Sequence, residues 1–290
     1  MFESSDLLLR RAAAILPSQA GYALTRRLTP VLGGDRRRWL GSVVTQKARD
    51  LLGDEHLAAA AGDAFVAEMA CDDLDAVTSV AWSDSRRLAS TRVVGAENLP
   101  ASGPAVVTSF HFSGGFRVFD VLRARGFTPT FLHVPPRERL KGYDAAMQNM
   151  RMRYLERHLS PPFIKPGPRT RGALDRHLGD GGVVVALLDV SPAAFELRDH
   201  TSATLLGRPL QLPVGLLRLA AKHDAPVIPY DGRIEDDRRV LEFHARARGS
   251  EPEALLADVL QTCERVIRTR PWTWQGWLDA DCLFAEAAEV

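Results

Sequence analysis

Beyond residue 92, short runs of β-branched and apolar residues alternate with longer stretches whose apolar residues have helical spacing. This alternation constrains the fold most, because strands separated by helices pair in a mostly parallel or mixed sheet that helices cover. The expected strands are residues 105–108, 128–134, 183–188, 226–230 and 240–244, and helices are expected at 143–159 and 172–178. The sequence therefore predicts an α/β fold with a mostly parallel or mixed central sheet flanked by helices.

The first 92 residues have a different pattern. Apolar residues recur at intervals of three and four from Ser5 onward, which is the spacing of one helix face. Asp54 and Asp72 are typical of helix starts, and the pair Gly33-Gly34 indicates a break. We therefore predict a helical N-terminal portion, residues 1–92, packed on an α/β portion, residues 93–290, either as two domains or as one continuous domain.

Composition narrows the classes of function. Of the 290 residues, 46% are hydrophobic, which is ample for a buried core, and the formal net charge is only +1. A chain with so little net charge has no overall field that attracts nucleic acid. The three cysteines, Cys71, Cys263 and Cys282, lack the paired spacing of a zinc site or a disulfide framework. We expect a reduced, cytoplasmic setting, with no metal and no cofactor.

The N-terminal segment does not have the pattern of a signal peptide, because Leu7-Leu8-Leu9 is followed at once by Arg10 and Arg11. No apolar run approaches the ~20 residues that span a bilayer. The first fifty residues are nevertheless rich in arginine and partly amphipathic, which suits an anionic membrane surface. The expected location is the cytoplasm, with peripheral contact at the inner face of the membrane as an option.

His111 is the leading candidate for a catalytic group. It follows the strand-like run 105–108, and a glycine-containing turn then leads into a helix-like stretch. Open α/β sheets place their chemistry at the carboxyl ends of strands, which is where this layout puts the imidazole. A carboxylate usually orients such a histidine, but the position five residues on, where one is expected, is Phe116.

An ordered set of motifs accompanies His111. They are Gly95-Ala96-Glu97-Asn98, a strand over 182–189 that ends in Asp189, the turn Leu206-Gly207-Arg208-Pro209, residues 213–221 and 225–229, and Arg270-Pro271-Trp272-Thr273-Trp274. In order and spacing, roughly residues 90–285 resemble the bacterial lipid A lauroyl/myristoyl acyltransferases, a branch of the lysophospholipid acyltransferase superfamily. Two positions depart from that family, since Phe116 replaces its motif acid and Val190 replaces a glutamine.

The resemblance implies an acyltransferase that uses His111 as a general base. Such an enzyme moves an acyl group from an acyl carrier protein or coenzyme A thioester to a hydroxyl or amine acceptor, here of a lipid or secondary metabolite. The alternative is a non-catalytic member that binds an acyl chain or a carrier protein after losing the pair formed by histidine and acid.

Two carboxylates are candidates for the missing acid. Asp120 lies one helical turn beyond Phe116, so it reaches His111 only through a water or a shifted helix start. Asp189 approaches the imidazole from the side if its strand neighbours the strand that precedes His111, and it ranks slightly above Asp120. A third option is an amine-like acceptor that needs little help from a base.

Other candidates concern substrate binding. Ser113, Gly114 and Gly115 precede a predicted helix, and Phe116 adjoins them. This segment is either a simple flexible turn or a site whose backbone N–H groups hold an oxyanion or a phosphate. Arg169 and Arg208 suit the phosphates of a carrier or coenzyme A, because guanidinium groups form paired hydrogen bonds with such groups. The aromatic residues after Pro271 either fill the core or line an acyl groove.

Overall fold

A computed structural model describes residues 2–32, 34–133, 142–160, 163–190 and 200–285. The described chain begins with the helices α1 (Phe2–Ile15), α2 (Ser18–Leu32), α3 (Gly34–Leu52), α4 (Glu55–Ala81) and α5 (Asp84–Ala89). As the helical spacing predicts, no strand lies among the described residues before Thr91. Helix α2 ends and α3 begins on either side of residue 33, where the glycine pair predicts a break.

The described residues form a central sheet in the order β1-β9-β8-β2-β5-β3-β4. Its strands are β1 (Thr91–Val94), β2 (Ala105–Ser109), β3 (Pro129–Leu132), β4 (Phe163–Ile164), β5 (Val183–Leu187), β8 (Val227–Glu235) and β9 (Arg238–Phe243). Neighbouring strands are parallel except β8 and β9, which are antiparallel. The predicted α/β fold with a mostly parallel sheet is confirmed.

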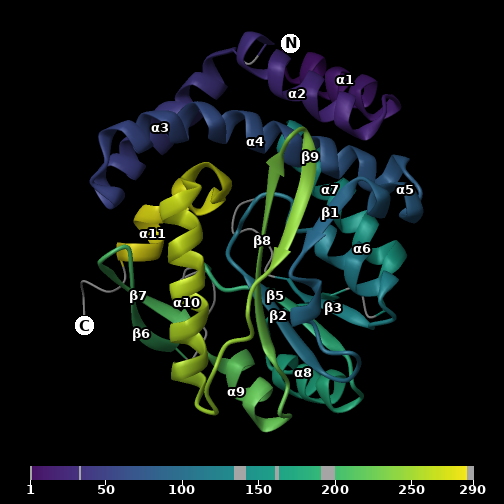
Figure 1. Cartoon of the computed structure of the whole chain (residues 1–290), viewed down its shortest axis with the longest axis vertical. Coiled ribbons are helices and arrows are strands. Elements are labelled where there is room, and N and C mark those ends of the chain that lie inside the picture. The colour runs from purple at the N-terminus through teal and green to yellow at the C-terminus, as the bar shows by residue number, and fades with distance from the viewer. Residues whose placement is uncertain (1, 33, 134–141, 161–162, 191–199, 286–290) are drawn as a thin grey trace.

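Helices cover both faces of this sheet (Figure 1). One face carries α6 (Arg117–Ala124) and α7 (Gly142–His158), and the other carries α8 (Thr170–Gly179), α9 (Gly215–Lys222) and α10 (Pro252–Thr269). Alternate residues of β2 point to opposite layers, so Val106 packs with the α10 side and Val107 with the α6 side. Every residue of β2 is buried, which is typical of a central parallel strand.

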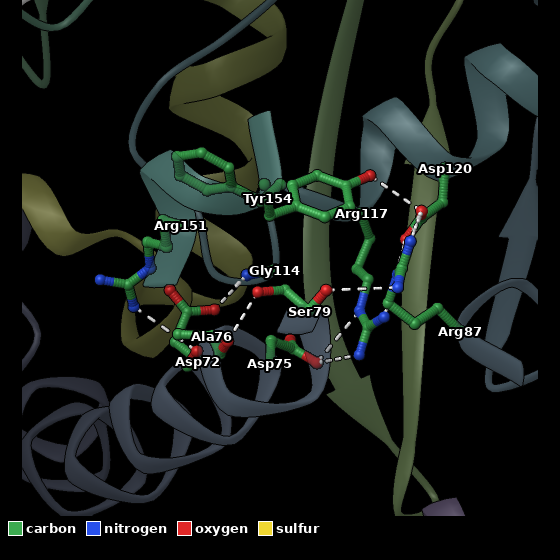
Figure 2. Close-up of a pocket in the computed structure, with 12 residues that line it drawn as sticks. Asp72, Asp75, Ala76, Ser79, Arg87, Gly114, Arg117, Asp120, Arg151 and Tyr154 are labelled. Atoms are coloured by element: carbon green, nitrogen blue, oxygen red, sulfur yellow. Dashed lines mark hydrogen bonds and ion pairs between the residues drawn. The ribbon is translucent and has the colours of Figure 1, made fainter. Parts of the chain in front are cut away.

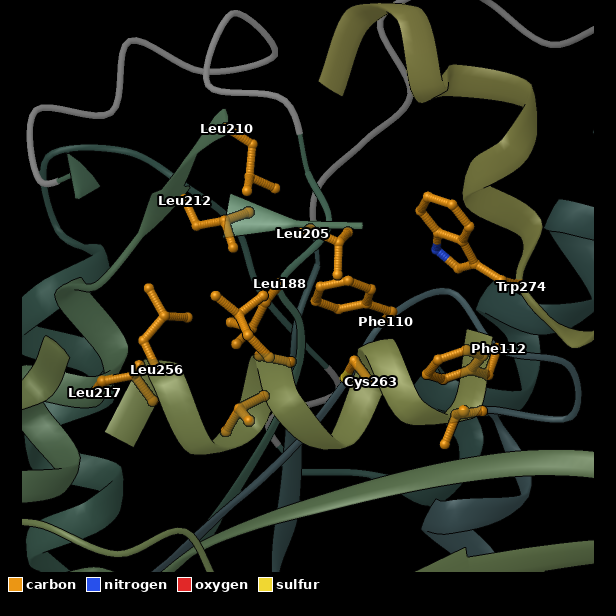
Figure 3. Packing of buried hydrophobic residues seen from close by; sticks show 14 of the residues in the cluster. Phe110, Phe112, Leu188, Leu205, Leu210, Leu212, Leu217, Leu256, Cys263 and Trp274 are labelled. Carbon is orange, nitrogen blue, oxygen red and sulfur yellow. The ribbon is translucent and has the colours of Figure 1, made fainter. Parts of the chain in front are cut away.

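The layer around α10 shows how the sequence builds this core. Buried residues of α10 recur at helical spacing, from Leu255 and Val259 to Cys263 and Val266, and they face the sheet (Figure 3). Each such aliphatic side chain contributes about 1.5–3 kcal/mol on burial. A hairpin of β6 (His200–Leu205) and β7 (Arg208–Pro213) packs on the same layer, and its turn coincides with the motif at 206–209.

Short elements complete the chain: η1 (Ala96–Asn98), η3 (Pro271–Thr273), η4 (Gln275–Asp279) and α11 (Ala280–Ala285). Helix α4 contacts α7, β8 and η3, so the N-terminal helices pack directly on the α/β portion. The division of the chain near residue 92 stays a prediction. None of the described helices combines the length and hydrophobicity that crossing a bilayer requires.

Asp72 is not a helix start, which corrects the prediction from its residue type. Helix α4 continues from Glu55 to Ala81, and Asp54 caps it by accepting a hydrogen bond from Leu57 N at 2.9 Å. Asp72 lies in the middle of α4 and accepts hydrogen bonds from the side chains of Ser113 and Gln275. Its side chain bonds to residues outside α4 and so does not compete with the backbone hydrogen bonds of the helix.

Candidate active site

The parallel pairing of β2 with β5 brings two distant segments to one edge of the sheet. Ser109 and Leu187 are register partners, and Leu188 N donates to Ser109 O at 2.8 Å. Because both strands run in the same direction, the residues two positions further on, His111 and Asp189, also become neighbours. The sheet thus places both side chains at its carboxyl edge, where open α/β folds bind their ligands.

His111 and Asp189 form a hydrogen-bonded pair. His111 Nδ1 lies 2.8 Å from Asp189 Oδ1, and the backbone N–H of His111 donates to both carboxylate oxygens, at 2.9 and 3.0 Å. The Asp189 side chain is fully buried, whereas the imidazole is 43% exposed. Because a carboxylate only accepts, we assign the proton to Nδ1, which leaves Nε2 as the basic nitrogen. No hydrogen bond occupies Nε2 within the described part of the chain.

Two opposing effects set the pKa of His111. Burial favours the neutral imidazole, but the charge of Asp189 and its hydrogen bond favour the imidazolium, and Asp279 adds a weaker attraction. The attraction prevails, so the pKa of His111 is raised above the ordinary value for histidine. A raised pKa makes the imidazole a stronger proton acceptor, which suits a general base.

The segment after α10 closes around this pair. Trp274 Nε1 donates to Asp189 Oδ2 at 2.8 Å, and Gln275 N donates to His111 O at 2.7 Å. Trp274 is fully buried against Phe110 (Figure 3), so this indole belongs to the core rather than to an acyl groove. Sequence reasoning missed its contact with Asp189, because nothing in the pattern of residues joins positions 85 apart in the chain.

The predicted anion site at Ser113 and Gly114 does not fit the structure. Ser113 N donates to Thr273 O at 2.9 Å, Ser113 Oγ donates to Asp72 Oδ1 at 3.1 Å, and Gly114 N donates to the same oxygen. Ser113 is only 1% exposed. The carbonyl of Thr273 and the carboxylate of Asp72 therefore occupy the donors that were expected to hold an oxyanion or a phosphate. Gly115, which is half-buried, stays a candidate.

Asp72 belongs to a buried charge network that fixes α4 to the turn after His111. Arg239 of β9, which is fully buried, donates to Glu68, to Asp75 and to Ser113 Oγ at 2.8–2.9 Å. The turn approaches the Arg239 side chain so closely that only glycine fits at position 114. Its φ is 70°, and a Cβ there would overlap the Arg239 side chain.

The sequence contained a signal for this network, because positions 68, 72 and 75 lie on one face of a helix. The sequence analysis predicts no internal partner for these three acidic residues. The same network includes Arg117 of α6, which donates to Asp75 Oδ1 at 2.7 Å.

Asp120 does not support His111, which corrects the second candidate for the missing acid. Its carboxylate accepts hydrogen bonds from Arg87 at 3.0–3.2 Å and from Tyr154 Oη at 2.8 Å (Figure 2). Its side chain is 4% exposed. Asp120 therefore anchors α6 to α5 and α7. The carboxylate that engages His111 Nδ1 is Asp189.

A small cavity lies beside this ion pair, between α4, α6 and α7 (Figure 2). Asp72, Asp75, Arg117 and Arg151 contribute to its lining, and its volume of about 20 Å³ suits roughly one water molecule. The Nη1 atom of Arg117 is buried without a hydrogen-bond partner and is a natural donor to such a water. The cavity is too small for an acyl chain, so we exclude it as a substrate site.

The other predicted binding residues lie apart from the pair. Phe116 precedes α6, and its ring packs against Phe119 and Phe131, with centroids 6.1 and 5.7 Å apart. Arg169, before α8, and Arg208, in the β6–β7 hairpin, are exposed. Across the described ranges, no hydrogen bond or ion pair joins either arginine to His111 or Asp189. Their roles in binding stay predictions.

Comparisons with known proteins assign no family. No protein-family model matches the chain, and a search of curated proteins gives no significant match. In the ranges that the structure describes, no three His, Cys, Asp or Glu side chains are arranged to hold a metal ion. The function must therefore be inferred from the motifs and from the geometry of the site itself.

Replacing Asp189 by Asn tests the pair directly. We expect the pKa of His111 to fall by about one unit or more, because burial persists while the attraction to the imidazolium is lost. An NMR titration of the imidazole carbons measures this shift. The matched control is Asp175→Asn, which removes the half-buried carboxylate beside His223 and leaves His111 untouched. An unchanged pKa in Asp189→Asn contradicts the assigned contact.

The role of Asp120 is tested through stability. We expect Asp120→Asn to lower the free energy of unfolding by about 3 kcal/mol, because it leaves the buried Arg87 without its main carboxylate. Urea denaturation measures the loss. Asp35→Asn is the control, because its ion pair with Arg38 is exposed and contributes about 1 kcal/mol or less. Equal stability in the two variants would show that the Asp120 contact is not a structural anchor.

Proposed function

We propose that this protein is an acyltransferase in which His111 is the general base and Asp189 its supporting acid. The contact between His111 Nδ1 and Asp189 Oδ1 at the carboxyl edge of the sheet carries this proposal. The motifs that resemble lipid A acyltransferases supply the reaction class. The donor is an acyl thioester of acyl carrier protein or coenzyme A, and the acceptor is a hydroxyl or amine of a lipid or secondary metabolite.

In the proposed reaction His111 first takes up one proton and then gives it away. As the acceptor oxygen or nitrogen attacks the thioester carbonyl, its proton passes to His111 Nε2. The carbon–sulfur bond then breaks, and the imidazolium returns the proton to the leaving thiolate. Asp189 fixes the reactive tautomer and stabilises the imidazolium between these steps, an effect on the order of 10⁴ in turnover where it has been measured in a comparable triad.

The position of Asp189 supports activity despite Phe116. The motif acid of the family stands five residues after its histidine, whereas Asp189 follows the neighbouring strand β5 and meets His111 Nδ1. An apolar residue at position 116 therefore leaves the imidazole with a carboxylate partner. This arrangement weighs against the alternative of a binding protein that has lost its pair of histidine and acid.

Activity assays test this function. Purified protein should transfer acyl groups from a panel of thioesters to candidate alcohols and amines, and His111→Ala should lower kcat at least about a hundredfold because the base is lost. His223→Ala is the matched control, since it removes a partly buried imidazole that also contacts an aspartate but lies outside the pair. Full activity in His111→Ala would remove His111 from the mechanism, and thioester binding without turnover by the unaltered protein would favour the non-catalytic alternative.

We further propose that the N-terminal helices contact an anionic membrane. Leu8 and Ile15, two turns apart on one face of α1, are 69% and 81% exposed, and Trp39 of α3 is 59% exposed. Arg11 lies on the exposed side of α1 between the two aliphatic residues. Apolar side chains beside arginines suit an anionic interface, where each basic residue contributes about 1 kcal/mol.

Flotation with vesicles tests the membrane contact. We expect binding to phosphatidylglycerol vesicles at low salt, weaker binding at high salt, and little binding to phosphatidylcholine alone, because the attraction is partly electrostatic. The double variant Leu8→Ser, Ile15→Ser should reduce binding, while Leu278→Ser, at another exposed apolar residue, should not. No flotation at low salt would refute the contact.

A further inference from the structure

The indole of Trp274 supplies the Asp189 carboxylate with a donor from outside the histidine. Asp189 Oδ1 accepts from the backbone N–H and from Nδ1 of His111. Asp189 Oδ2 accepts from that same backbone N–H at 3.0 Å and from Trp274 Nε1 at 2.8 Å. The indole N–H is therefore the one described donor to this carboxylate that does not belong to His111.

The indole is fixed in place from several sides. Its ring meets Trp277 edge-on, with centroids 4.7 Å apart, and it packs against Phe110 at 6.3 Å. A Cβ at Gly276 would overlap the ring, so the backbone also confines it. These contacts hold the indole in the orientation in which its N–H donates to Asp189 Oδ2.

The backbone around Trp274 is anchored independently of the indole. Thr273 O accepts from Ser113 N, and Gln275 N donates to His111 O. The side chain of Gln275 donates to Asp72 Oδ2 at 2.5 Å. The indole N–H can therefore be removed while these contacts keep the segment in its place.

We infer that Trp274 is a positioning residue that sets how strongly Asp189 attracts a proton on His111. The indole N–H draws negative charge toward Oδ2, away from the oxygen that faces the imidazole. Without that donor, more charge remains on Oδ1, while the backbone N–H of His111 still holds the carboxylate in place. The kinetic consequence rests on the proposed transferase reaction, whereas the effect on His111 itself does not.

The other groups near the pair do not substitute for the indole. Asp279 of η4 also attracts the imidazolium, but the Trp274→Phe substitution leaves its carboxylate in place. Tyr230 and Cys263 lie near Asp189, but burial raises the pKa of each above its ordinary value, so both stay neutral around pH 7. A change in His111 on removal of the indole N–H is therefore attributable to Asp189.

Trp274→Phe removes the N–H and keeps an aromatic ring. We expect the NMR-measured pKa of His111 to rise by about half a unit to one unit, because a hydrogen bond to a charged group is lost. The pH midpoint of kcat/KM should rise equally, so that kcat/KM falls up to about tenfold at neutral pH and recovers at higher pH. Trp82→Phe is the matched control, because that buried indole donates to Ala14 O at 2.6 Å and not to Asp189.

A second variant protects the test against misfolding. Site-specific replacement of Trp274 by benzothienylalanine keeps the bicyclic shape and removes only the N–H. An unchanged or lowered pKa of His111 in that variant overturns the inference. If the variant raises the pKa of His111 but the unaltered protein has no transferase activity, the inference is upheld and the proposed function is refuted. If the variant is fully active and the pKa of His111 is unchanged, only the inference is refuted.

Discussion

A carboxylate with no access to solvent is the constraint on which the rest of the site depends. A buried charge is tolerated only if hydrogen bonds replace its water, and Asp189 receives them from His111 and Trp274. These bonds dictate the orientation of the imidazole and the path of the segment after α10. The Asp189 carboxylate therefore fixes the positions of His111 and Trp274, and it leaves the imidazole of His111 partly exposed.

A second set of buried charges gives the site its frame. Arg239 and Arg117, both almost fully buried, connect α4 to β9 and α6 through the carboxylates of Glu68 and Asp75. Removing one member of such a network leaves its partners unpaired, which costs far more than the pair contributes when intact. Buried ion pairs as well as apolar packing therefore hold α4 against the sheet. Arg239 also holds the turn after His111 through its hydrogen bond to Ser113 Oγ.

Much of the fold was predictable, because its core strands are local patterns. The runs at 105–108 and 183–188 are apolar and β-branched, and the structure places β2 and β5 within a residue of those bounds. The two-residue strand β4 is too short to leave a pattern. Asp72 was misjudged because its residue type favours helix starts, while its actual partners, Ser113 and Gln275, are distant in sequence.

The candidate site was predictable only in part, for the same reason. His111 and Asp189 both follow strands, so the sequence identified them, but only the pairing of β2 with β5 decides that they meet. Asp120 ranked only slightly below Asp189 by helical spacing, and its ion pair with Arg87 is what places it elsewhere. The indole of Trp274 gave no local sign of its contact, since tertiary packing alone brings it to the carboxylate.

His111, Asp189 and Trp274 come from three segments separated by 78 and 85 positions. Bringing them together requires two long loops to close, each at an entropic cost that only the finished fold repays. Sites of such high contact order form cooperatively with the whole domain and not in a fragment of it. The arrangement of His111, Asp189 and Trp274 therefore forms only when the strands β2 and β5 and the segment after α10 have come together.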